Sequence, residues 1–185
     1  MLVEIIVQTI GFLAMGFGII SYQINKHKSI MILKTVSETL FAFQFFLLGS
    51  YTGLAMNAIG IVRNLTFAKL VQKGKNTKPF IVLFAMIMIV AGIFTWNGYI
   101  SLLAICGKMF TTLAFGFKRP KMVRLVTIPS CLLWIVYDLL SNSIAGFLTE
   151  IFGLTSIIIA YFRFDRENKN GGNNIRRNRF AKAHR

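Results

Sequence analysis

Seven apolar stretches, each close to the length needed to cross a bilayer, are the feature that most constrains this chain. A helix of about 20 apolar residues spans the ~30 Å hydrocarbon core of a membrane. The chain has 185 residues, of which 55% are hydrophobic, and its mean hydropathy is +0.64. The pattern predicts an all-α membrane protein with seven transmembrane helices, at 5–22, 30–48, 51–71, 79–96, 99–117, 122–140 and 144–162.

The charge of the connections alternates along this series. Every second connection is basic, with Lys26 and Lys28, then Lys69, Lys73, Lys75 and Lys78, then Lys118, Arg119, Lys121 and Arg124. The connections between these carry no Lys or Arg. Basic residues in short loops mark the cytoplasmic side of a membrane. We therefore expect the N-terminus outside and the C-terminus in the cytoplasm.

The formal net charge of +15 does not by itself indicate a nucleic-acid partner. Much of it lies in these loops and in the tail at 165–185, which lacks apolar periodicity and is expected to be disordered. Binding of single-stranded RNA usually requires aromatic side chains on a folded platform, and Phe180 is the tail's one aromatic residue. We expect the tail to lie against anionic lipid, and we expect no nucleic-acid partner.

The two cysteines, Cys106 and Cys131, both fall within apolar stretches and are expected to pack as small hydrophobic residues. They form no Cys-x-x-Cys pair and have no Cys/His spacing typical of a metal site. We expect no metal and no cofactor.

The two ends of the chain resemble each other at an offset of 93 positions. At this offset Asn57 falls on Glu150, and Phe41 falls on Trp134. Ser and Gly residues coincide as Ser50 with Ser143, Gly53 with Gly146, and Gly60 with Gly153. The sequence therefore predicts a 3+1+3 arrangement: a first three-helix repeat (1–72), a linker helix (73–98), a parallel second repeat (99–164) and the basic tail (165–185).

Polar groups at matched depth suggest a binding site between the repeats. Asn57 and Glu150 lie inside spanning segments, and such groups usually face a protein interior or cavity. Phe41 and Trp134 precede them by 16 positions and could supply aromatic walls to a pocket. Alternatively, Asn57 forms an interhelical hydrogen bond and the two rings only pack.

Four glycines share the helix faces of Asn57 and Glu150. Small residues let helices approach closely in lipid, so a role in helix packing is expected for Gly53, Gly60, Gly146 and Gly153.

Further charged residues interrupt the apolar stretches. Glu38, Arg63 and Lys108 are expected to form an intramembrane charge network with Glu150, in which Arg63 and Lys108 pair with the two glutamates. Alternatively, Glu38 or Glu150 binds a cationic solute or a proton. Lys34 is expected to extend to the lipid headgroups, and Asp138 to lie near the outer surface in contact with solvent.

Several of these residues belong to stretches that resemble the YgjV family of small bacterial inner-membrane proteins. The resemblance is carried by FFLLGSY at 45–51, by Trp134, by SIAG at 143–146 with Glu150, and by Phe162 with Arg163. It covers nearly the whole chain apart from the tail, and it implies a multi-pass protein of the bacterial cytoplasmic (inner) membrane.

More distantly, the layout is similar to SWEET sugar carriers and PQ-loop transporters. That resemblance implies a solute site formed by Asn57 and Phe41 in the first repeat and by Glu150 and Trp134 in the second. Glu150 stands where the SWEET pattern has a second Asn, which argues against a neutral sugar. Tyr22 stands where the PQ-loop pattern has its proline.

Together these features predict a small-solute transporter that works by alternating access between the two repeats, with a polar or cationic substrate. The alternative is a non-transporting receptor or assembly partner built on the same helices. An enzyme is not expected, because the two histidines, His27 and His184, lie outside the predicted spans and no catalytic set is evident. The expected partners are the lipid bilayer and a small solute, and a homo-oligomer is left open.

Overall fold

Seven α-helices and a short π-helix form the part of the chain that the structure describes. The structure is a computed structural model, which describes the backbone of residues 2–166 and the side chains of residues 4–164. The α-helices are α1 (Leu2–Tyr22), α2 (His27–Leu47), α3 (Tyr51–Gln72), α4 (Lys78–Phe94), α5 (Ile100–Phe115), α6 (Pro120–Leu140) and α7 (Ile144–Ala160). The π-helix η1 covers Tyr161–Arg166. The predicted seven helices are confirmed.

The C-terminal boundary differs slightly from the prediction. Regular structure continues through η1 to Arg166, two residues into the segment at 165–185 that was predicted to be a disordered tail. Residues 167–185 lie outside the described part of the chain, so the rest of that prediction is untested.

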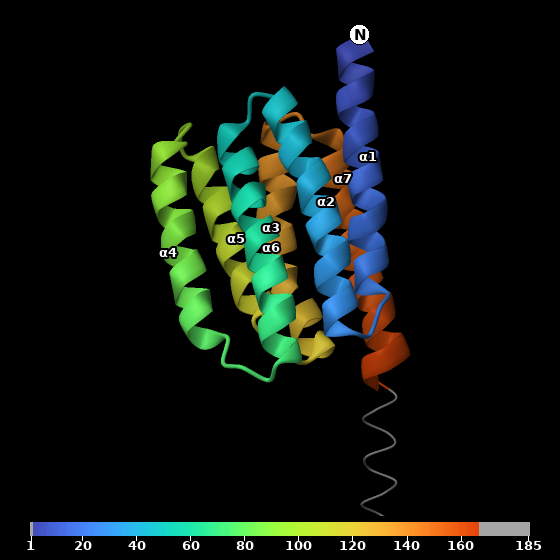
Figure 1. Cartoon of the computed structure of the whole chain (residues 1–185). Helices are drawn as coiled ribbons and strands as arrows, with labels where there is room; N and C mark the ends of the chain where they lie inside the picture. Colours follow the sequence, from blue (N-terminus) through green and yellow to red (C-terminus); the bar gives the residue numbers. More distant parts are fainter. Residues whose placement is uncertain (1, 167–185) are drawn as a thin grey trace, which may run out of the picture.

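The helices form a closed ring with one helix outside it (Figure 1). Along the ring, α1 packs on α2, α2 on α3, α3 on α5, α5 on α6, α6 on α7, and α7 on α1. Helix α4 packs against α3 and α5 from outside the ring. Residues from both predicted repeats therefore face one shared interior.

The lengths of the helices fit a membrane protein. Five of the helices (α1, α2, α3, α6 and α7) are long and apolar enough to span a bilayer. Helices α4 and α5 are shorter, with 17 and 16 residues. Both end two residues before their predicted C-termini, because Thr95 and Gly116 already form the C-caps.

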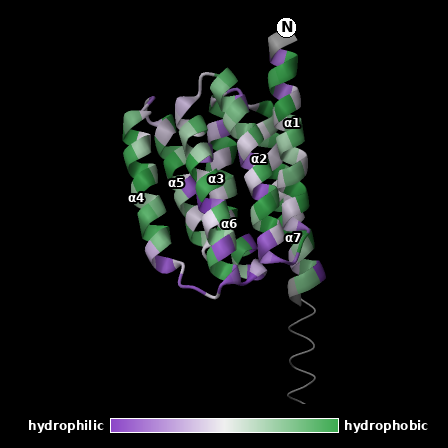
Figure 2. Ribbon diagram, viewed as in Figure 1, coloured by the Kyte–Doolittle hydropathy of each residue, from purple (hydrophilic) through white to green (hydrophobic). Residues whose placement is uncertain are grey.

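The distribution of polarity is the reverse of that in a water-soluble bundle. Large apolar side chains are exposed on the outer faces of all seven α-helices, and hydrophilic residues gather at the end of the bundle where α3 joins α4 (Figure 2). The interior holds almost as many buried polar or charged residues as hydrophobic ones. Apolar surface on this scale marks contact with lipid.

The two halves contain equivalent helix boundaries and turns. Helices α2 and α6 begin and end at positions 93 apart, and so do the starts of α3 and α7. The α2–α3 turn passes through Gly49 at φ 68°, and the α6–α7 turn passes through Asn142 at φ 56°. Gly and Asn are the residues that most readily adopt this left-handed conformation at a helix C-terminus.

Hydrogen bonds repeat at the same offset. The Ser37 hydroxyl donates to the Ala14 carbonyl at 2.8 Å, and the Ser130 hydroxyl donates to the Gly107 carbonyl at 2.7 Å. These bonds tie α2 to α1 and α6 to α5 in the same way. They support the predicted duplication, which remains a prediction together with its repeat boundaries.

Candidate functional site

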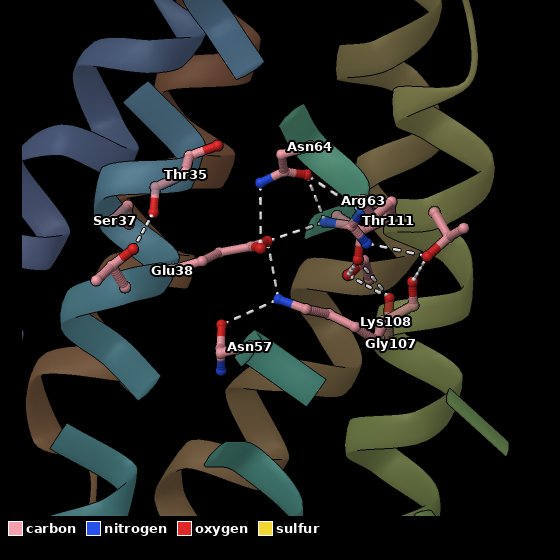
Figure 3. A network of polar contacts seen from close by, with 12 residues as sticks. Thr35, Ser37, Glu38, Asn57, Arg63, Asn64, Gly107, Lys108 and Thr111 are labelled. Atoms are coloured by element: carbon pink, nitrogen blue, oxygen red, sulfur yellow. Dashed lines mark hydrogen bonds and ion pairs between the residues drawn. The ribbon is translucent and has the colours of Figure 1, made fainter. Parts of the chain in front are cut away.

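The centre of the bundle contains a charged network drawn from α2, α3 and α5. Glu38 lies on α2, Arg63 and Asn64 on α3, and Lys108 on α5 (Figure 3). Asn57 and Asn64 share one face of α3, because positions seven apart lie two turns apart on an α-helix. All five residues are buried.

Glu38 is the common acceptor of this network. Its Oε1 accepts from Lys108 Nζ at 2.8 Å and from Arg63 Nη2 at 3.0 Å. Its Oε2 accepts from Asn64 Nδ2 at 3.1 Å. Lys108 Nζ also donates to Asn57 Oδ1 at 3.0 Å. The carboxylate therefore links both predicted halves through charge-assisted hydrogen bonds, the stronger class of such bonds.

Arg63 has further partners that hold its guanidinium in place. It donates to Asn64 Oδ1 at 2.9 and 3.1 Å and to Thr112 Oγ1 at 2.9 Å. Its guanidinium carbon lies 4.8 Å from the centre of the Phe115 ring. Such an array offsets much of the cost of burying the cation.

A cavity of about 50 Å³ lies beside this network. Its walls come from α1, α2, α3, α5, α6 and α7 and not from α4. Twelve of its sixteen lining residues form six pairs that are 93 positions apart: Tyr22 with Phe115, Lys34 with Thr127, Ser37 with Ser130, Phe41 with Trp134, Phe45 with Asp138, and Asn57 with Glu150. Most of the cavity lining therefore comes from positions that correspond at the predicted 93-residue offset.

The four residues predicted to bind substrate all line this cavity. These are Phe41, Asn57, Trp134 and Glu150. Phe41 and Trp134 both belong to one aromatic cluster with Phe45. The structure brings the four residues together around one space, and their role in binding remains a prediction.

The predicted charge pairing is wrong in one respect. Arg63 and Lys108 do not divide between Glu38 and Glu150, because both pair with Glu38. Helix α3 packs between α2 and α5, which places both cations beside Glu38, whereas α7 packs against α1 and α6. Within the described residues, Glu150 forms no ion pair.

Lys34 also differs from the expectation that it would extend to the headgroups. Its Nζ lies 4.0 Å from the centre of the Tyr22 ring, and the residue lines the cavity. The signal was present in the sequence, since Lys34, Glu38, Phe41 and Phe45 recur at i, i+4, i+7 and i+11 and therefore share one face of α2.

Asp138 was expected near the outer surface in contact with solvent; it does lie two positions from the end of α6 at Leu140, but the expected contact with solvent is wrong. The residue is only 2% exposed and lines the cavity. It lies one turn after Trp134 on the same face of α6, close to Gly146 of α7. Its equivalence to Phe45 at the 93-residue offset could have shown that it faces inward.

The four predicted packing glycines are not alike. A Cβ on Gly60 would collide with the Glu38 carboxyl, and one on Gly53 would lie 2.8 Å from the Tyr137 hydroxyl oxygen. A Cβ on Gly146 would lie 2.6 Å from the Asp138 carboxyl carbon. At Gly153 the nearest atom would be Tyr22 Cε2 at 3.5 Å, an ordinary contact. A Cβ would therefore have to displace a neighbouring side chain at three of the four positions but would fit at Gly153, and the role of the four glycines in helix packing remains a prediction.

An apolar exterior around a buried charged centre defines a helical integral membrane protein. Comparison with known families agrees with that class. The model of the Imp-YgjV family, described as bacterial inner membrane protein, matches residues 5–168. The chain belongs to this family, as its sequence resemblance had implied. No curated protein and no solved structure gave a significant match.

Proposed function

We propose that this chain is a small-solute transporter that works by alternating access between its two three-helix halves. The halves are residues 1–72 and 99–164, and the segment 73–98 with α4 joins them. The solute is polar or cationic and binds at Phe41, Asn57, Trp134 and Glu150. The proposal involves no chemical conversion of the solute.

The observation that carries this proposal is the paired lining of the cavity. Six pairs of lining residues come from equivalent positions of the two halves, so the cavity lies where the halves meet. Movement of one half against the other would change access to this space from either side. Polar intramembrane residues that line a cavity typically mark a solute pathway.

The size of the cavity fits a closed conformation. About 50 Å³ is room for roughly one or two water molecules. Lys108 of the second half holds Glu38 and Asn57 of the first half at 2.8 and 3.0 Å. We infer that entry of a larger solute requires these contacts between the halves to rearrange.

The test begins with purified protein and a panel of sugars, amino acids, nucleosides and organic cations. A compound that binds the folded form raises the melting temperature, and the compounds that do so are then used in uptake assays with proteoliposomes. We expect Asn57→Ala and Glu150→Gln to abolish uptake with unchanged expression. Thr155→Ala, on an exposed face of α7, is the matched control and should transport normally. Normal uptake by both site variants would refute the proposal.

The second candidate function is a receptor or assembly partner without transport. It is favoured by the Glu38–Arg63–Lys108 network, which ties α2, α3 and α5 together. A ligand that raises the melting temperature through Asn57 and Glu150, but shows no flux in proteoliposomes under any imposed gradient, would favour this alternative.

The proposal also includes the resemblance to SWEET and PQ-loop carriers. It includes as well the orientation of the chain in the membrane, with the C-terminus in the cytoplasm. An odd number of helices places the two ends of the described chain on opposite sides of the bundle (Figure 1). The basic connections α1–α2, α3–α4 and α5–α6 all lie at the end where α7 terminates. Basic loops on the cytoplasmic side then support a cytoplasmic C-terminus.

A further inference from the structure

Two carboxyl groups in the cavity lack the cationic partners that Glu38 has. Within the described residues, neither Asp138 nor Glu150 forms an ion pair. Asp138 is 2% exposed, and its Oδ1 is buried with no hydrogen-bond partner in the part of the chain that the structure describes. Both residues line the cavity, and both come from the second half, on α6 and α7.

A buried carboxyl oxygen without a partner is expensive to retain. Burial of a polar group costs free energy unless a hydrogen bond compensates for it. The surroundings of Asp138 nevertheless make room for it, since Gly146 has no Cβ at the point where one would meet the carboxyl. An isosteric Asn could occupy the same space without a charge. We therefore expect the missing partner of Asp138 to be a ligand.

The walls beside Asp138 are suited to a cation. The ring centres of Phe45 and Trp134 are 6.1 Å apart, and those of Trp134 and Tyr137 are 5.1 Å apart. Aromatic faces attract ammonium groups through the quadrupole of the ring. The chain itself provides an example, because the Lys108 ammonium nitrogen lies 5.4 Å from the centre of the Trp134 ring.

The charges around the cavity balance in number, with Lys34, Arg63 and Lys108 against three carboxyl groups, but within the described residues no cation pairs directly with Asp138 or Glu150. Lys108 and Arg63 are both held by Glu38. Lys34 lines the cavity with its Nζ against the Tyr22 ring, and its ammonium is the positive charge that would compete for Glu150. Asp138 is therefore the carboxyl most available to a ligand.

We propose that Asp138, assisted by Glu150, binds the ammonium group of a small organic monocation. This rests on the proposed function and names the class of its solute. The aromatic rings of Phe45 and Trp134 flank the ligand. Because the cavity measures about 50 Å³, the ligand that fits without opening the halves is a primary amine with one or two carbon atoms.

The test uses the purified full-length chain in detergent and methylammonium chloride as the probe. Methanol is the uncharged isostere, and potassium chloride keeps the ionic strength constant. We expect methylammonium at tens of millimolar to raise the melting temperature, methanol at equal concentration to have no effect, and tetraethylammonium to be too large. A ligand with so few atoms is expected to bind in the millimolar range.

Three variants locate the site. Asp138→Asn is expected to fold with an equal or higher melting temperature and to lose the methylammonium effect. Glu150→Gln is expected to weaken methylammonium binding about tenfold, by loss of a charge-assisted contact. Glu4→Gln removes an exposed carboxyl near the start of α1 and should leave the methylammonium effect unchanged.

The outcomes separate this inference from the proposed function. Equal effects of methylammonium and methanol, or an undiminished methylammonium effect in Asp138→Asn, would overturn the inference. The inference would also be overturned if a neutral solute were transported and its flux required Asn57 but not Asp138. The proposed transport function would still hold in that case. Binding of methylammonium that requires Asp138, without flux of labelled methylammonium in proteoliposomes, would support the inference and count against transport.

Discussion

At the scale of single residues, Glu38 holds the most consequential position in the bundle. Its carboxylate is the acceptor for two buried cations, and the three side chains sum to a charge of +1. Removal of one member of a buried charge network leaves the others uncompensated, which costs about 3–5 kcal/mol. The contribution of the network is best measured by changing Glu38 alone and then together with a partner.

We therefore expect Glu38→Gln to lower the free energy of unfolding by about 3–5 kcal/mol. The double variant Glu38→Gln/Lys108→Met should recover part of this loss, because one of the two stranded cations is then absent. Denaturant unfolding in detergent measures both values. Thr39→Ala, at the next and exposed position, is the control and should change stability by less than about 0.5 kcal/mol. Additive effects of Glu38→Gln and Lys108→Met would contradict the network.

Gly60 and Gly153 correspond at the 93-residue offset, and comparing them tests whether glycine is needed for close packing of the helices. A Cβ at Gly60 would collide with the Glu38 carboxyl, whereas a Cβ at Gly153 would make an ordinary contact with Tyr22. We expect Gly60→Ala to destabilise the protein by about 1–3 kcal/mol through displacement of Glu38. Gly153→Ala should be neutral, or stabilising by up to about 1 kcal/mol, because Ala favours the helix. Melting temperatures of the two variants measure the difference in stability. Equal losses of stability in both variants would contradict the expected difference between Gly60 and Gly153.

At the scale of elements, the two hairpins α2–α3 and α6–α7 have the same construction. In each one a serine amide donates to a carbonyl five residues earlier, Ser50 to Phe45 at 2.9 Å and Ser143 to Asp138 at 2.8 Å. The residue just before each serine has a positive φ. These turns fix the rotation of α3 and α7, and hence the direction in which Asn57 and Glu150 face.

Exchange of the turn residues tests this equivalence. Gly49→Asn and Asn142→Gly should each change the free energy of unfolding by less than about 1 kcal/mol, since both residues tolerate positive φ. Gly49→Val should cost more, about 1–2 kcal/mol, because a β-branched residue is strained at φ 68°. Thermal unfolding in detergent distinguishes the three variants. A Gly49→Val protein as stable as the parent would show that the turn does not control the hairpin.

At the scale of the whole molecule, the orientation in the membrane can be tested independently of transport. We expect a reporter fused after Arg185 to report a cytoplasmic location, and one inserted between Asn97 and Gly98 to report the outer side. The physical reason is the alternation of basic and uncharged connections. Paired fusions to alkaline phosphatase and a fluorescent protein measure this, and the opposite result at both positions would reverse the proposed topology.

The number of helices was predictable because it depends on a local property. A stretch of about 20 apolar residues must satisfy its own backbone hydrogen bonds in lipid, and a helix does so without help from the rest of the chain. The predicted limits of α3 and α7 agree with the structure to within two residues. The 93-residue offset likewise anticipated which residues line one cavity, as Phe41, Asn57, Trp134 and Glu150 show.

The sequence by itself therefore determined the membrane class, the helices and which positions are related by the 93-residue offset, because these follow from hydropathy and spacing along the chain. Only the tertiary structure decided which charges meet. Glu38 takes both Arg63 and Lys108, and among the described residues no cation pairs with Asp138 or Glu150, because α3 packs between α2 and α5 while α7 packs against α1 and α6. Which charged residues pair depends on the order of the helices around the ring and on the rotation of each helix. Neither can be read from the spacing of residues within a single helix.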